Sequence, residues 1–215
     1  MNLKEVRDLV SLGENQTIEF KRKVAFPEKV VREMVAFANT SGGYLLVGVE
    51  DDGSMPGLKN PEEHDYALNK AVVELCVPRL KYKRDVIALS EKKSVLCYKV
   101  DQVNRKPLYA KENAQDKYGK AYVRVADKTI QASREMTQIL RKGNSKKSHS
   151  FTYGEKEAVL MRLLDQEGQT TLSRYADEAN INRRVASSTL VLLVLSGVLE
   201  ISPSEKEDIF KLKKF

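Results

Sequence analysis

Hydrophobic and polar positions repeat with two different periods along this 215-residue chain. Where apolar residues recur every three or four positions, the pattern predicts amphipathic helices. Where they alternate with polar residues or form short continuous runs, it predicts strands. The helices are expected at 2–12, 27–38, 61–77 and 134–140, and the strands at 17–23, 44–49, 81–89, 94–100 and 122–125. This mixture of elements predicts an α+β fold class.

The pattern changes after about residue 140. Segment 141–150 is polar and basic and has no periodicity, which is typical of a linker. Three helical patterns and two short strand patterns follow, at 155–164, 171–179, 182–196, 198–202 and 208–212. Three helices before a hairpin resemble a winged helix-turn-helix. We therefore predict two domains, 1–142 and 151–215, joined by a linker at 143–150.

The net charge of +7 and the pI of about 9.2 favour an anionic partner such as nucleic acid. Residues 1–150 hold 28 Lys and Arg against 20 Asp and Glu, whereas residues 151–215 hold 9 against 10. The excess of basic over acidic residues therefore lies in the first 150 residues, which include the first domain. A surplus of lysine also serves solubility, so the charge has a second explanation.

No apolar run approaches the roughly 18 residues of a membrane span, and charged residues are spread through the first 13 positions. We therefore expect a cytoplasmic protein with no membrane partner. Cys76 and Cys97 lie in apolar surroundings without metal-ligand spacing, so we expect reduced core residues. No G-x-x-x-x-G-K-[ST] segment is present, so no ATP is expected as a cofactor.

Acidic residues gather at the predicted strand ends. Glu14 precedes one strand, Glu19 lies within it, and Asp51 follows the next. Three converging carboxylates could bind Mg²⁺ or Mn²⁺ and assist phosphodiester cleavage. Alternatively, Glu19 pairs with Lys21 on an exposed strand face opposite the core, and Asp51 belongs to a turn.

Two sets of polar residues are candidates for nucleic-acid contacts. Basic residues of the first domain could position a duplex through its phosphates without reading its sequence: Lys21, Arg22, Lys23, Arg124 and Lys128. The third helix of the second domain opens with residues able to meet base edges and phosphates: Asn182, Arg183, Arg184 and Ser187. The second domain is nearly neutral, however, and such modules also serve in dimerisation or protein docking.

Three sequence blocks resemble the Schlafen Alba-like domain: Glu14 to Lys21, Phe37 to Asp51 and Tyr122 to Ser133. The third block has Ala126 where glycine is usual and Ile130 where a basic residue often follows. The resemblance implies a nucleic-acid-binding module with a mixed central sheet and flanking helices. The three acids match the acidic site of animal Schlafen RNA-cleaving enzymes position by position, whereas bacterial relatives are described as regulators.

We therefore predict a DNA-binding transcriptional regulator that requires no cofactor for binding. The alternatives are a metal-dependent endoribonuclease, acting on RNA through Glu14, Glu19 and Asp51 with Mg²⁺ or Mn²⁺, and a protein-docking role for the winged helix. Animal relatives pair two similar lobes into one groove. A homodimer is therefore expected to build the equivalent surface from this chain.

Overall fold

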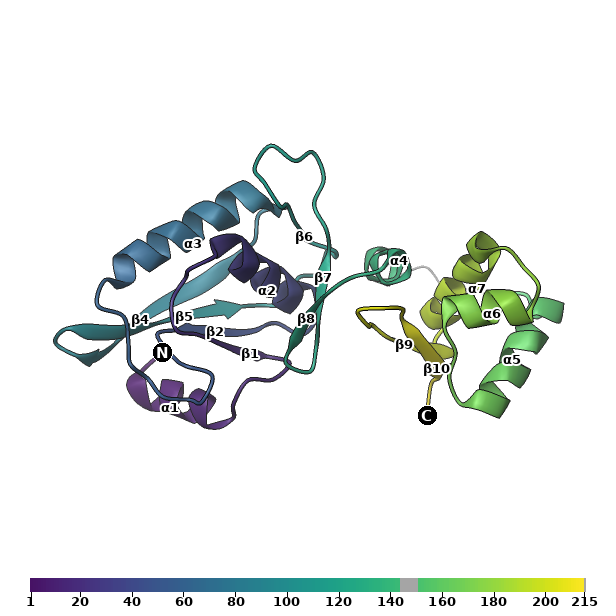
Figure 1. Ribbon diagram of the computed structural model, residues 1–215, viewed down its shortest axis with the longest axis horizontal. Coiled ribbons are helices and arrows are strands. Elements are labelled where there is room, and N and C mark those ends of the chain that lie inside the picture. The colour runs from purple at the N-terminus through teal and green to yellow at the C-terminus, as the bar shows by residue number, and fades with distance from the viewer. Residues whose placement is uncertain (144–150, 215) are drawn as a thin grey trace. The chain divides into compact units, whose positions relative to one another are not determined.

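The computed structural model describes residues 1–143 and 151–214. Its contacts divide the chain into two compact units, Met1–Gln131 and Ala132–Phe215 (Figure 1). The predicted first boundary, after residue 142, differs from this division because the helix that precedes it packs within the second unit. The predicted linker lies outside the described residues from 144 onward. Within the described residues, no helix is long and apolar enough to cross a membrane.

The first unit is built on a mixed sheet with the strand order β1-β2-β5-β4. Strands β1 and β2 are parallel, and the other neighbours are antiparallel. The α+β class is thereby confirmed. The elements of this unit are α1 (Leu3–Ser11), β1 (Ile18–Lys21), α2 (Pro27–Asn39), β2 (Gly43–Val47), α3 (Pro61–Leu75), β3 (Cys76–Val77), β4 (Tyr82–Ser90), β5 (Lys93–Val100), β6 (Tyr109–Ala110), β7 (Tyr122–Val125) and β8 (Lys128–Gln131).

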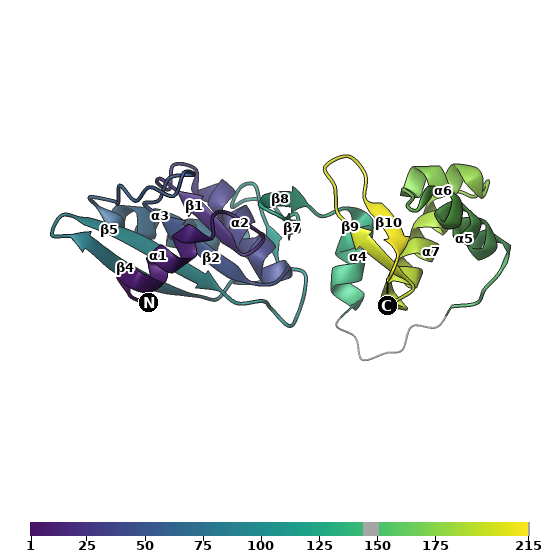
Figure 2. The ribbon, with the colours of Figure 1, turned by 90° about the horizontal axis from the view of Figure 1, so that it is seen from below.

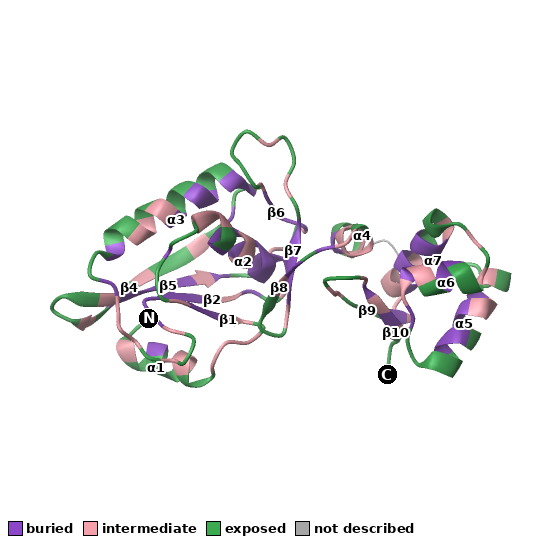
Figure 3. Cartoon of the chain, in the orientation of Figure 1, coloured by how far each residue is buried: buried purple, intermediate pink, exposed green. Residues whose placement is uncertain are grey.

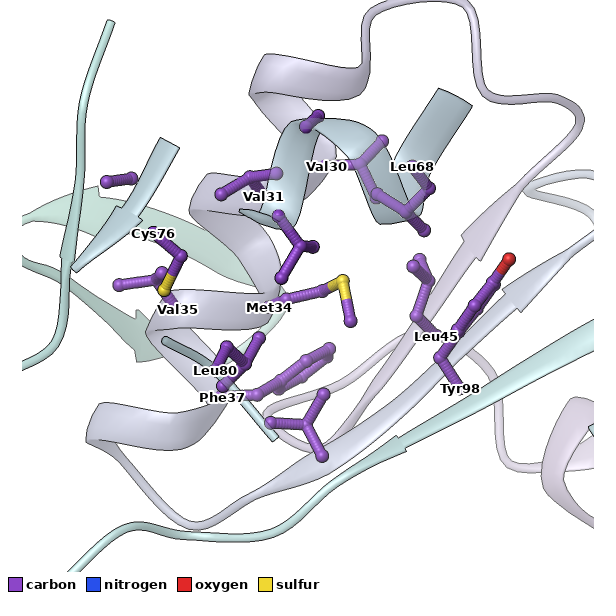
Figure 4. Close-up of a cluster of buried hydrophobic side chains, with 14 of the residues drawn as sticks. Val30, Val31, Met34, Val35, Phe37, Leu45, Leu68, Cys76, Leu80 and Tyr98 are labelled. Carbon is purple, nitrogen blue, oxygen red and sulfur yellow. The ribbon is translucent and has the colours of Figure 1, made fainter. Parts of the chain in front are cut away.

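Helices cover both faces of this sheet. Leu45 and Tyr98 pack with Met34 and Phe37 in the core below α2 and α3 (Figure 4). Leu46 points to the opposite face, which α1 covers (Figure 2). Complete burial of a large apolar side chain contributes about 1.5–3 kcal/mol, so both faces contribute to stability. Figure 3 shows the result: α2 and the central strands are mostly buried, whereas β4 and the outer side of α3 are exposed.

The end of α2 is fixed by polar contacts that the hydrophobic pattern does not report. The Asn39 side chain is buried, donates to the carbonyls of Leu108 and Tyr122 at 2.9 Å and accepts from the Leu108 N–H at 2.7 Å. Gly42 then adopts a φ of 75°, and its N–H donates to the Phe37 carbonyl at 2.8 Å. The glycine therefore stops the helix, and this N–H is already satisfied within the chain.

The second unit contains helices followed by a hairpin. Its elements are α4 (Arg134–Lys142), α5 (Glu155–Glu167), α6 (Leu172–Glu178), α7 (Arg183–Leu195), β9 (Leu199–Ser202) and β10 (Ile209–Leu212). Thr170 forms an isolated bridge with Phe210, which extends the hairpin by a short third segment. Leu160, Tyr175 and Leu190 pack with Phe210 in the core of this unit.

Helix α4 packs against α7 within the second unit. Ser133 caps α4, because its Oγ accepts from the Met136 N–H at 2.9 Å. The same hydroxyl donates to Asp208, just before β10, and Glu135 accepts from Ser187 on α7. These bonds explain why the contact boundary falls before α4.

Candidate nucleic-acid interface

Glu14 closes the free edge of β1. This strand pairs only with β2 in the sheet, and the Phe20 N–H donates to Glu14 Oε1 at 2.8 Å. Burial raises the pKa of Glu14 above its ordinary value, and repulsion from Glu19 and Asp51 adds to the rise. Glu14 is therefore near enough to Glu19 and to Asp51 for their charges to affect it. Glu14 nevertheless has a structural role, because it satisfies an edge N–H.

Glu19 lies in a buried charge network. The sequence pattern placed it on an exposed face, but its neighbour in register, Leu45, packs in the core with α2, and Arg124 of β7 bonds to it. Glu19 is therefore only 7% exposed. Its Oε2 accepts from Arg124 Nη1 at 2.8 Å, and its Oε1 accepts from Lys21 Nζ. The predicted pair with Lys21 is present, but it is inside the fold.

Arg124 is the central cation of this network. Its side chain is 1% exposed and donates to the Asn15 carbonyl at 2.7 Å and the Thr129 hydroxyl at 3.1 Å. The guanidinium also lies 4.9 Å from the centroid of the Phe37 ring, a cation–π distance. Arg124, which was predicted to contact phosphate, is thus buried among partners within the chain.

Glu33 on α2 completes the network and was missed by the sequence analysis. Its Oε1 lies 3.2 Å from Lys21 Nζ, so the lysine sits between two carboxylates. Burial and the nearby Glu19 charge raise the pKa of Glu33 to about 7. Burial opposes the charge of Lys21, but Glu33 and Glu19 outweigh it and raise the lysine pKa. Glu33 occupies a polar position of an amphipathic helix, so the hydrophobic pattern gives no signal of its burial.

The acidic residues do not fit a metal site. Among residues 1–143 and 151–214, no three His, Cys, Asp or Glu side chains lie together as a ligand set. Both oxygens of Glu19 face cations of the chain, and Glu14 accepts a backbone N–H. Asp51 is exposed in the turn that the Glu50 N–H closes by donating to the Ser54 carbonyl. We therefore derive no catalytic step through a metal.

Three predicted basic residues do lie on the surface of the first unit. The Arg22 side chain is 73% exposed, and its Nε lies 3.1 Å from Glu50 Oε1. Lys23 is exposed beside it, and Lys128 is exposed at the β7–β8 turn. Ala126 in that turn has a φ of 53°, so it adopts the backbone conformation usually supplied by glycine. Lys21, by contrast, is held in the network.

The start of α7 presents part of the predicted reading surface. Asn182 caps the helix by accepting from the Val185 N–H at 2.9 Å. Arg183 is exposed, donates to the Ser173 hydroxyl and lies 3.6 Å from Glu207, while Arg184 is exposed. Ser187 is only 7% exposed and donates to Glu135 of α4. Ser187, which was predicted to contact a base, thus lies under α4.

One protein family and several solved structures are similar to this chain. A family model described as Schlafen, AlbA_2 matches residues 14–133, and no curated protein matches. The DIP2311 protein from Corynebacterium diphtheriae is similar at 17% identity and TM-score 0.42, over 70% of this chain and 29% of that one. The N-terminal domain of a RecG-related protein from Nitrosomonas europaea is similar at 23% identity and TM-score 0.42, over 69% and 98%. The chain thus spans less than a third of the length of the DIP2311 protein.

Proposed function

Because the chain belongs to the Schlafen, AlbA_2 family through residues 14–133, we propose that it binds DNA and acts as a transcriptional regulator. The observation that carries this proposal is the separation of its charges. The buried cations of the first unit are neutralised by Glu19 and Glu33, whereas Arg22, Lys23 and Lys128 are exposed. The exposed cations can meet phosphates without disturbing the fold.

This surface would hold the phosphate backbone without reading sequence. Each phosphate that a cation neutralises releases condensed counterions, so affinity falls as salt rises. If about six phosphates are contacted, log K should fall with log salt at a slope of about −5. Replacing Arg22 and Lys23 by alanine should make the slope less steep by about one for each lost contact, independently of sequence.

The start of α7 would supply sequence preference. Arg183 and Arg184 are exposed in the first turn of α7, directly after its N-cap Asn182. A recognition helix in the major groove contacts bases with its N-terminal residues. Lost base contacts of this kind weaken binding by about 1–3 kcal/mol each. The double variant Arg183→Ala, Arg184→Ala should therefore lose preference among sequences. Ser187→Ala is the matched control, because Ser187 is covered by α4.

The decisive experiment selects duplexes from a random pool with the full chain and then measures affinity over a salt series. We expect steep salt dependence for every variant that keeps the surface cations, and loss of sequence preference only in the arginine double variant. A salt slope near zero for the unaltered chain would remove the DNA-binding proposal. Full discrimination by the double variant would instead favour the docking role for the second unit.

Metal-dependent RNA cleavage is the alternative that the resemblance of Glu14, Glu19 and Asp51 to animal RNA-cleaving relatives implies, although these acids form no ligand set among the described residues. Asp51→Asn is the cleaner probe, since Asp51 is exposed and Glu19 holds Arg124. We expect no cleavage of structured RNA when Mn²⁺ or Mg²⁺ is added to the purified chain. Metal-dependent cleavage that Asp51→Asn abolishes would replace the regulator proposal by an endoribonuclease.

A further inference from the structure

The segment between β1 and α2 exposes a large aromatic ring. Phe26 is 59% exposed, although phenylalanine has no polar group that water could hydrate. The residue directly precedes Pro27, the first residue of α2, and follows the exposed Arg22 and Lys23. The local backbone holds this position, because the N–H groups of Lys29 and Val30 both donate to the Phe26 carbonyl.

Positive charges accompany this ring. The Lys29 Nζ lies 4.7 Å from the ring centroid, a distance typical of a cation–π contact. Arg22 and Lys23 add two exposed cations within the same short segment. Tyr118, at 77% exposure, also has a lysine over its ring, with Lys117 Nζ 5.3 Å from the centroid. Leu12, at 68% exposure, directly follows α1 and has no aromatic ring.

An exposed aromatic ring beside a lysine, on a segment that carries two more exposed cations, matches the chemistry of an unpaired nucleotide. A flat ring stacks on any base, and neighbouring lysine and arginine side chains meet the phosphates on either side. A base inside a duplex is already stacked and cannot use such a ring. We therefore propose that Phe26 is a stacking platform for an unpaired base of single-stranded nucleic acid, with Arg22, Lys23 and Lys29 contacting the adjacent phosphates.

This proposal rests on nucleic-acid binding by the chain, and it adds a preference for unpaired bases. Stacking of one base on an aromatic side chain raises affinity about tenfold. Phe26→Ala should therefore weaken binding of a single-stranded oligonucleotide about tenfold and leave duplex affinity unchanged. Because the ring is largely exposed, the circular dichroism spectrum and the unfolding midpoint should not change.

The chain contains no tryptophan, which permits a direct optical test. Phe26→Trp introduces a single indole at the proposed platform, and Leu12→Trp introduces one at an exposed apolar position elsewhere. A single-stranded oligothymidine and a blunt duplex of equal length are added to each. We expect the single strand to quench Phe26→Trp emission and leave Leu12→Trp emission unchanged, and the duplex to quench neither.

Two results would overturn the platform. The first is equal quenching of both tryptophan variants. The second is the absence of a selective loss of single-strand affinity in Phe26→Ala, whether that affinity is unchanged or falls equally with duplex affinity. Absence of binding to either nucleic acid by the unaltered chain would instead refute the proposed function itself. If the unaltered chain binds the duplex, the proposed DNA binding holds, and only the stacking role of Phe26 is in question.

Discussion

Replacing Arg124 by methionine tests the buried network most directly. Methionine keeps much of the side-chain volume, but it removes the donors to Glu19, the Asn15 carbonyl and the Thr129 hydroxyl. Removing one partner of a buried ion pair destabilises a protein by about 3–5 kcal/mol, because the other charge stays buried. Glu19 still faces Lys21, so we expect a loss near 3 kcal/mol.

The measurement is urea unfolding of the full chain, monitored by near-ultraviolet circular dichroism. Seven of the nine tyrosines lie within Met1–Gln131, so the signal reports mainly on this unit. Adding Glu19→Gln removes the second charge, and the double variant should therefore recover about 1–3 kcal/mol relative to the sum of the single losses. Arg22→Met is the matched control, because its exposed pair contributes at most about 1 kcal/mol.

One outcome would refute this reasoning. If Arg124→Met leaves the unfolding midpoint unchanged but weakens DNA binding more than Arg22→Met does, Arg124 acts at the surface. The network described above would then not determine the stability of the unit.

Three further predictions follow from individual residues. The pKa of Glu33 is raised to about 7, so protonation of Glu33 stabilises the folded state below about pH 4.5, and this contribution is lost as pH rises through 7. Glu33→Gln should therefore make the unfolding free energy depend less on pH between pH 5 and 8. An unchanged pH profile would contradict this prediction. Ala126→Gly should stabilise the first unit by up to about 1 kcal/mol in the same urea assay, since a positive φ is strained for alanine. Destabilisation would show that alanine is not strained at this position. Asn182→Ala should destabilise the second unit by about 1 kcal/mol in thermal unfolding while Asn182→Ser does not, and equal losses would exclude the cap as the cause.

The secondary structure was largely predictable, because hydrophobic periodicity is a local property. Ser133 and Asn182 are cap residue types that stand directly before an apolar-periodic segment, although Asn182 was predicted to contact nucleic acid. Strands β3 and β6 were missed because a two-residue strand has no period to detect. The small pairing of β7 with β8 was missed in part, because the two-residue turn between them lacks its usual glycine.

The candidate site was less predictable, because burial of a charge depends on distant partners. Arg124 alternates with apolar residues in its strand, a pattern that normally marks a solvent-facing position. It is buried because Glu19, 105 residues earlier, comes from the neighbouring layer and accepts its charge. The burial of Ser187 has the same cause, since Glu135, which accepts from its hydroxyl, lies 52 residues earlier. Single-sequence patterns contain neither pairing.

The unit boundary also changes where the basic excess lies. With α4 in the second unit, residues 1–131 hold 23 Lys and Arg against 19 Asp and Glu, a net +4, and residues 132–215 hold 14 against 11, a net +3. Within the first unit, the four charges of Glu19, Lys21, Glu33 and Arg124 cancel when all are ionised, so its excess comes from the remaining, more exposed side chains. The salt dependence of DNA binding should therefore come from both units, and removing surface cations from one alone should leave part of it.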